Sequence, residues 1–226
     1  LNNAMYGTYN LVDPAAPATV LLVESLREII GVRLSKEIAV DLYVGLYLET
    51  GGFRYNNTTP EVLRLASELV AAGVNPKWVG ELVYERQPLR RMKLLARALE
   101  SLTVRDGVSW MCVSREDFAS VHGTEEDVED FVEYPRMVRN VKIAVFMRET
   151  TAHDIRVSLR AKADVPVNRI AERFGGGGHA YAAGCTIPGV RADGARRQLA
   201  AAIRREMARG PGPSAPRARA RPKPAA

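Results

Sequence analysis

The segment Phe174-Gly-Gly-Gly-Gly-His-Ala-Tyr-Ala-Ala-Gly-Cys185 places four consecutive glycines directly before a histidine. Each glycine costs roughly 0.5–1 kcal/mol in conformational entropy relative to alanine, so packing alone does not favour such a run. Main-chain N–H groups freed of side chains can form an anion-binding nest, and the histidine can donate a hydrogen bond to a phosphate oxygen. The alternative is a glycine-rich turn beside an incidental histidine. The segment therefore predicts a phosphate site formed by Gly175, Gly176, Gly177, Gly178 and His179.

The residues that flank the glycines carry helix and strand patterns. We expect a helix over 167–174 that runs into the glycines, and a strand over 185–187. Ala182-Ala183-Gly184 is expected to begin a helix whose N-terminal dipole adds to the phosphate site. The rest of this half alternates between apolar strand patterns and helices that begin at cap residues such as Ser114. Its other expected elements are strands over 108–113, 142–148 and 154–160, the last two as a hairpin-like pair, and helices over 115–121, 125–134 and 192–208.

The N-terminal part of the chain reads as a series of helices with recognisable ends. Ser35 and Thr59 are expected N-caps, Pro60 suits a first helical position, and Gly73 suits a C-terminal end. The basic helix that closes the series is a candidate connection between two lobes. The expected helices cover 17–30, 35–47, 60–73, 76–86 and 88–102.

The composition is that of a soluble globular protein with a basic tail. Of the 226 residues, 46% are hydrophobic, enough to bury a core in one large or two small domains. No apolar run reaches the roughly 18–20 residues of a membrane span and no signal peptide is recognisable, so we expect a cytoplasmic protein without a membrane partner. Cys112 and Cys185 are expected to be reduced, with one disulfide as the alternative. The tail carries four of the net +6 charges, so nucleic-acid binding elsewhere requires a local patch.

Three segments together resemble one protein family. Residues 174–185 resemble the signature of the DHH-associated domain, and Arg156-Val-Ser-Leu-Arg160 resembles a strand of the same domain. Glu49-Thr-Gly-Gly-Phe-Arg-Tyr-Asn-Asn-Thr-Thr-Pro60 resembles the last catalytic-domain motif of DHH phosphoesterases. The order and spacing of the segments match as well, and the resemblance covers roughly residues 5–205. Within the family, the chain is most similar to bacterial oligoribonucleases that also act as 3′-phosphoadenosine 5′-phosphate phosphatases.

The resemblance implies an α/β fold with two lobes and an active-site cleft between them. The larger lobe of the family is a catalytic domain that binds two metal ions, typically manganese, which activate water and stabilise displacement at phosphorus. The smaller lobe has a mixed sheet and holds the phosphate and base of the substrate. In this chain the expected parts are a C-terminal remnant of the catalytic domain (1–87), a connecting helix (88–104), the substrate-binding domain (105–208) and a disordered basic tail (209–226).

The first Asp- and His-containing motifs of the family, among them the Asp-His-His triplet, are not found in this sequence. The chain begins with Leu1, its first methionine is Met5, and its first residues resemble the segment that follows the triplet. We therefore expect a truncated reading frame or a trimmed chain, with most metal ligands upstream. His122, His153 and His179 are not expected to replace those ligands.

Three charged residues are further candidates for the site, and the arguments for them differ in strength. Glu49 lies where the family motif has an aspartate metal ligand, which implies a surviving Mn²⁺ ligand. Its extra methylene displaces the carboxylate, so a solvated or capping carboxylate is the equal alternative. Arg160 is expected to assist the phosphate site, because arginine suits bidentate phosphate contacts. Arg54 is a further substrate-binding candidate, with a surface salt bridge as its alternative, and Arg148 and Arg156 read as exposed strand residues.

Two functional hypotheses remain open. In the first, the complete protein is a manganese-dependent phosphoesterase that hydrolyses very short RNA or 3′-phosphoadenosine 5′-phosphate. No catalytic residue is identified in this chain, so we expect little activity from the chain alone. In the second, a degenerate or truncated family member binds nucleotides or oligonucleotides without cleaving them. Cyclic dinucleotides are a further substrate that the sequence does not separate from these, and a homodimer is left open.

Overall fold

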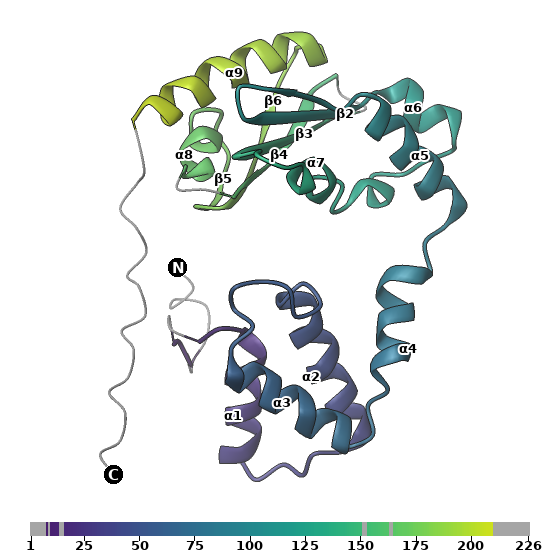
Figure 1. Cartoon of the computed structure of the whole chain (residues 1–226), viewed down its shortest axis with the longest axis vertical. Coiled ribbons are helices and arrows are strands. Elements are labelled where there is room, and N and C mark those ends of the chain that lie inside the picture. The colour runs from purple at the N-terminus through teal and green to yellow at the C-terminus, as the bar shows by residue number, and fades with distance from the viewer. Residues whose placement is uncertain (1–7, 9, 14–15, 151–152, 163–164, 210–226) are drawn as a thin grey trace. The chain divides into compact units, whose positions relative to one another are not determined.

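Figure 1 presents a computed structural model of the chain, which forms two compact units, Leu1–Arg86 (unit 1) and Gln87–Ala226 (unit 2). In the described part, no helix is both long and apolar enough to cross a membrane. The expected disordered tail lies, apart from Arg209, outside the described residues. The structure describes residues 8, 10–13, 16–150, 153–162 and 165–209.

Unit 1 consists of helices in its described part. The Ser35 hydroxyl accepts a hydrogen bond from the Ile38 N–H, and the Thr59 hydroxyl accepts one from the Val62 N–H, each at 3.3 Å, so both predicted N-caps are confirmed. Apolar side chains of the three longest helices form one core around the fully buried Leu46. The helices are α1 (Thr19–Ile29), α2 (Lys36–Glu49), α3 (Pro60–Ala71), α4 (Pro76–Gly80) and the π-helix η2 (Glu81–Glu85).

Unit 2 is organised around a six-stranded mixed sheet, which confirms the predicted α/β class. The strand order is β1-β2-β3-β4-β6-β5, in which β2 and β3 pair in parallel and all other neighbours pair antiparallel. The strands are β1 (Thr103–Arg105), β2 (Val108–Val113), β3 (Ile143–Glu149), β4 (Ile155–Ala161), β5 (Gly177–His179) and β6 (Ala182–Ile187). The helices are α5 (Leu89–Glu100), α6 (Arg115–Ser120), the 3₁₀ helix η3 (Glu126–Val128), α7 (Glu133–Met137), α8 (Val167–Glu172) and α9 (Ala192–Ala208).

Helices cover both faces of this sheet (Figure 1). On one face, α8 and α9 pack against alternate side chains of β3 and β4, among them Val145, Val157 and Leu159. On the other face, α5 packs against β2, together with the segment that contains the buried Phe131. The helix α5, expected as a connection between lobes, thus contributes Leu94 and its neighbours to the core of unit 2.

Two of the expected helices are wrong. Ala182 begins strand β6 rather than a helix, so no helix N-terminus follows the glycines. The main-chain groups of β6 pair with β4 along its whole length, which satisfies them without helical hydrogen bonds. The helix expected over 125–134 is replaced by η3 and α7. There, Arg90 binds the Asp127 carboxylate, and Arg91 binds main-chain carbonyl groups of the same segment, so contacts with α5 override the local helix pattern.

Candidate phosphate-binding site

One cross-strand row of the unit 2 sheet has small residues at its centre. The register pairs Phe146 of β3 with Ser158 of β4, Ser158 with Gly184 of β6, and Gly184 with Gly177 of β5. Directly paired residues project to the same face of a sheet. A serine and two glycines therefore lie side by side on the face opposite α9, and no bulky side chain projects from the sheet there.

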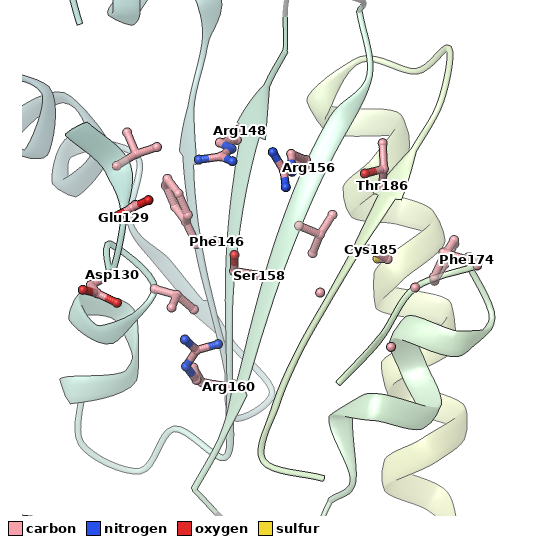
Figure 2. Close-up of a pocket in the computed structure, with 17 residues that line it drawn as sticks. Glu129, Asp130, Phe146, Arg148, Arg156, Ser158, Arg160, Phe174, Cys185 and Thr186 are labelled. Atoms are coloured by element: carbon pink, nitrogen blue, oxygen red, sulfur yellow. The ribbon is translucent and has the colours of Figure 1, made fainter. Parts of the chain in front are cut away.

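A pocket of about 670 Å³ opens above this row. Residues 128–130 with Val132, and residues 174–177, contribute to its lining from the two sides of the row. Figure 2 shows Arg148 and Arg156 together at one end of the pocket and Arg160 towards the other. The register explains this arrangement, because Arg148 pairs with Arg156, whereas Arg160 is four residues further along β4, roughly 13 Å at the usual rise of a strand.

The structure places different steric and backbone requirements on the four glycines of the cluster. A Cβ atom at Gly176 would overlap the Gly184 carbonyl oxygen, and one at Gly178 would lie 2.6 Å from the Ala182 carbonyl oxygen, so both permit close packing against β6. Gly175 has a φ of +72°, which favours glycine. Gly177 has no positive φ, and a Cβ there would meet no atom within 4 Å. The fold itself therefore does not require glycine at position 177.

The structure brings Gly175, Gly176, Gly177 and Arg160 together in the pocket lining, as the sequence predicts for a shared site. Gly178 is outside that lining, and so is His179, which is exposed at the end of β5. The register pairs His179 with Ala182 and Ala182 with Arg160, so the histidine shares a row with Arg160 two strands away. Its contact with a phosphate stays a prediction.

Glutamate side chains hold the three arginines of the pocket. Glu133 Oε1 accepts a hydrogen bond from Arg160 Nε at 2.8 Å. Glu125 Oε2 accepts hydrogen bonds from Arg148 Nη2 and from Arg156 Nη1, each at 3.2 Å. Burial lowers the pKa of Arg148 from its ordinary value, although Glu125 opposes the shift. The guanidinium groups are thus held in position for oxygen acceptors.

Sequence reasoning missed the role of two of these arginines. The prediction that Arg148 is an exposed strand residue is wrong, because its side chain is only 17% exposed, whereas that of Arg156 is 55% exposed. A usable signal was present: Arg156, Ser158 and Arg160 alternate along one strand and must share a face. What the sequence did not contain was the antiparallel register of β3 and β4 that places Phe146 and Arg148 beside them.

The remaining predicted site residues lie in unit 1. Glu49, the last residue of α2, accepts a hydrogen bond from the Thr19 N–H at 2.7 Å, where α1 begins. This contact is the capping alternative, and the metal role of Glu49 stays a prediction. Arg54 Nε donates to the Gly51 carbonyl oxygen at 2.6 Å, so its guanidinium stabilises its own loop. Among the described residues, no three His, Cys, Asp or Glu side chains are placed to hold a metal ion, so these residues alone do not fit a manganese site.

Both cysteines are free thiols, as predicted. Cys185 lines the pocket beside Gly176, and burial raises its pKa to about 11. Burial, with a smaller contribution from Glu149, raises the pKa of Cys112 to about 12. Since the thiolate is the nucleophile, neither residue is suited to nucleophilic chemistry at neutral pH.

The fold and the pocket lining define an α/β domain with an arginine- and glycine-lined cavity. Residues 118–208 match the DHHA1 domain, and the chain belongs to the DHH family. It is 35% identical over 207 residues to the bifunctional oligoribonuclease and PAP phosphatase NrnA of Thermus thermophilus. The aligned region is 92% of this chain and 62% of that protein. It is also 30% identical over 176 residues to the A-adding tRNA nucleotidyltransferase of Geobacter sulfurreducens, or 75% of this chain and 19% of that protein.

A solved structure supports the same family. The exopolyphosphatase-related protein of Bacteroides fragilis matches with a TM-score of 0.78 and 30% sequence identity. The match covers 83% of this chain and 56% of that one. The chain therefore spans only part of the length of these relatives, 62% for the Thermus protein and 56% for the Bacteroides protein.

Proposed function

We propose that unit 2 binds a phosphate group of a nucleotide or a very short RNA, and that the complete protein hydrolyses phosphoester bonds in such molecules. One observation carries the proposal: Arg148, Arg156 and Arg160 share a pocket with Gly177, a glycine that the fold does not require. Guanidinium groups bind phosphate oxygens through parallel hydrogen bonds, and a glycine allows a ligand to approach the main chain. The Thermus relative, named for oligoribonuclease and PAP phosphatase activity, supports this class of substrate.

The pocket also has room and surface for a base. Its volume of about 670 Å³ exceeds the need of a single phosphate group and lies in the usual range of small-molecule sites. The half-buried Phe174 contributes aromatic surface to the lining, and unpaired bases stack on aromatic side chains. We therefore propose 3′-phosphoadenosine 5′-phosphate or a dinucleotide, rather than free phosphate, as the ligand.

Manganese is part of the proposal for the complete protein only. Bound metal ions would activate water and stabilise charge at the phosphorus atom. Within the described residues of this chain no fitting ligand set is found, so we assign this chain the task of holding and orienting the substrate. The cytoplasmic location and the homodimer expected from the sequence likewise remain predictions.

A second candidate function is a binding module that does not cleave its ligand. The observation that favours it is the match to the Geobacter nucleotidyltransferase, in which the shared region is only 19% of a protein named for a different reaction on RNA. A nucleotide-binding unit that occurs beside different activities would explain this match. Incubation of the complete protein with MnCl₂ and a diadenosine dinucleotide separates the two functions, because a binding module forms no adenosine monophosphate.

Calorimetric titration with 3′-phosphoadenosine 5′-phosphate tests the binding site itself. We expect saturable binding to the wild-type chain. The affinity of Arg156→Ala should be at least about tenfold lower, since hydrogen bonds to charged groups contribute about 1.5–3 kcal/mol. Arg197→Ala is the matched control, because Arg197 is an exposed arginine of α9 on the opposite side of the sheet. Equal affinity of wild type and Arg156→Ala would remove this pocket from the proposal.

A further inference from the structure

Two of the pocket arginines are joined by a single carboxylate oxygen. Glu125 Oε2 lies 3.2 Å from Arg148 Nη2 and 3.2 Å from Arg156 Nη1, and Arg148 Nη1 also donates to the Glu125 carbonyl oxygen at 3.2 Å. A phosphate oxygen that bridges two guanidinium groups would take the same place. The carboxylate of Glu125 therefore occupies the position between the two guanidinium groups that an anionic ligand would take.

Glu133, which binds the third pocket arginine, differs from Glu125 in burial and in contacts. Glu133 is only 22% exposed and contacts two partners, Arg160 at 2.8 Å and Arg136 at 2.9 Å. Glu125 is 56% exposed, and its contacts are longer. Its pair with Arg156 is exposed on both sides, and exposed ion pairs contribute about 0.2–1 kcal/mol, so water or another anion can replace the carboxylate there at little cost. Glu133 thus fixes Arg160, whereas Glu125 is displaceable.

The main chain around Glu125 is held in place independently of its carboxylate. The Thr124 N–H and hydroxyl both donate to Asp127, whose carboxylate also accepts from Arg90. Arg91 donates to the carbonyl oxygens of residues 127 and 129 and stacks on Phe131 at 5.0 Å. Because these contacts fix the segment, rotation of the Glu125 side chain frees Arg156 Nη1 and Arg148 Nη2, while Arg148 Nη1 keeps its hydrogen bond to the Glu125 carbonyl oxygen.

We infer that Glu125 is a resident competitor of the anionic ligand, which must displace its carboxylate to reach Arg148 and Arg156. This inference rests on the proposed function. It means that a residue outside the pocket lining lowers the affinity of the site for its ligand. A carboxylate offers one bridging oxygen here, whereas a phosphate group can offer a separate oxygen to each guanidinium. The competitor therefore selects phosphate groups over ligands that carry a single carboxylate.

Titration of three variants with 3′-phosphoadenosine 5′-phosphate at fixed ionic strength tests the inference. Glu125→Gln removes the competing charge, and we expect it to bind about threefold to fivefold tighter than wild type, the range for an exposed ion pair. Glu125→Asp keeps the charge but shortens the side chain, so its affinity should also rise. Glu126→Gln is the matched control: the same charge is lost one residue away, where no ion pair with the described residues is found.

The outcomes separate the inference from the proposed function. Tighter binding by both Glu125 variants, with Glu126→Gln close to wild type, supports the competitor. If the wild-type chain binds the bisphosphate and Glu125→Gln binds it equally or more weakly, the inference is overturned and the proposed site stands. A gain of the same size in Glu126→Gln assigns the effect to net charge and also overturns it. If no variant binds, the proposed function of this pocket is lost together with the inference.

Discussion

The two glycine-containing segments of the chain, residues 49–60 in unit 1 and residues 174–185 in unit 2, use their glycines in opposite ways. In the first, a Cβ atom at Gly51 would overlap the ring of Tyr55, and the loop's polar groups bind nearby main chain. Glu49 caps α1, and Arg54 binds the Gly51 carbonyl oxygen. Space around this segment is therefore filled by the segment itself.

The second segment leaves space open. Neither Gly175 nor Gly177 would bring a Cβ within 4 Å of another atom, and both line the pocket that contains the arginines. The comparison teaches that a run of glycines does not by itself identify a ligand site. What identifies it is a glycine whose missing side chain the surrounding protein neither fills nor requires. Gly177 meets this criterion, while its neighbour Gly176 does not.

The largest effect is expected for Gly176→Ala. The added methyl group would overlap the Gly184 carbonyl oxygen and lie 2.6 Å from Cys185 Cβ, so β6 must move away from the glycine segment. Overpacking of this kind costs about 1–3 kcal/mol and sometimes more, here against rigid main chain. We expect a clear loss of stability of unit 2 in urea unfolding followed by circular dichroism. Unchanged stability would mean that the close approach to β6 does not explain this glycine.

A smaller effect, on binding alone, is expected for Gly177→Ala. Its methyl group would project into open space on the pocket side, so stability should stay within about 0.5 kcal/mol of wild type. Affinity for 3′-phosphoadenosine 5′-phosphate should fall about tenfold, because the methyl group blocks approach of the phosphate to the main chain.

Gly194→Ala is the control for this variant. It adds a methyl group to α9, where the nearest atom would be Val190 Cβ at an ordinary 3.5 Å, and it lies far from the pocket lining. If Gly177→Ala and Gly194→Ala bind the bisphosphate equally well, the open space at Gly177 is not a ligand position, and the contrast between the two segments disappears.

Much of the fold was predictable because its signals are local. The caps at Ser35 and Thr59 mark helix starts, and strand β2 and helix α9 have the predicted bounds. The strand predicted over 185–187 is the second half of β6, but β5 and the first half of β6 were not predicted, because a run of glycines and alanines has no apolar alternation and this part of β6 is defined by its pairing with β4.

The site was predictable only in part for a related reason. The glycines and Arg160 lie close together in sequence signatures, so local reading finds them. Arg148 lies in the pocket because β3 pairs it with Arg156, and Glu125 reaches these two arginines from a segment that α5 holds in place. Such pairings join residues that are distant in the chain, and no periodicity in one segment records them.

The capping contact of unit 1 gives the next prediction, of moderate size. Glu49→Ala removes the acceptor of the Thr19 N–H at the start of α1, and loss of a helix cap costs about 0.5–2 kcal/mol. Unfolding of unit 1 should shift accordingly, whereas Glu68→Ala, an exposed change on α3, should not. If Glu49 is instead a metal ligand, MnCl₂ should stabilise the wild-type chain and not the variant, because a ligand that binds the folded state raises its stability.

The smallest effect is expected at the cysteines and reports on the pocket directly. The pKa of Cys185 is raised to about 11 and that of Cys112 to about 12, mainly by burial, so at pH 8 roughly one thiol in a thousand or fewer is a thiolate. Alkylation by iodoacetamide should therefore be slow in the folded chain and should accelerate as the pH rises towards these values.

Cys185 lines the pocket and Cys112 does not, so bound 3′-phosphoadenosine 5′-phosphate should slow alkylation of Cys185 alone, as measured by peptide mass spectrometry. Equal protection of both thiols would point to general stabilisation of unit 2, and protection of neither would place the ligand away from β6.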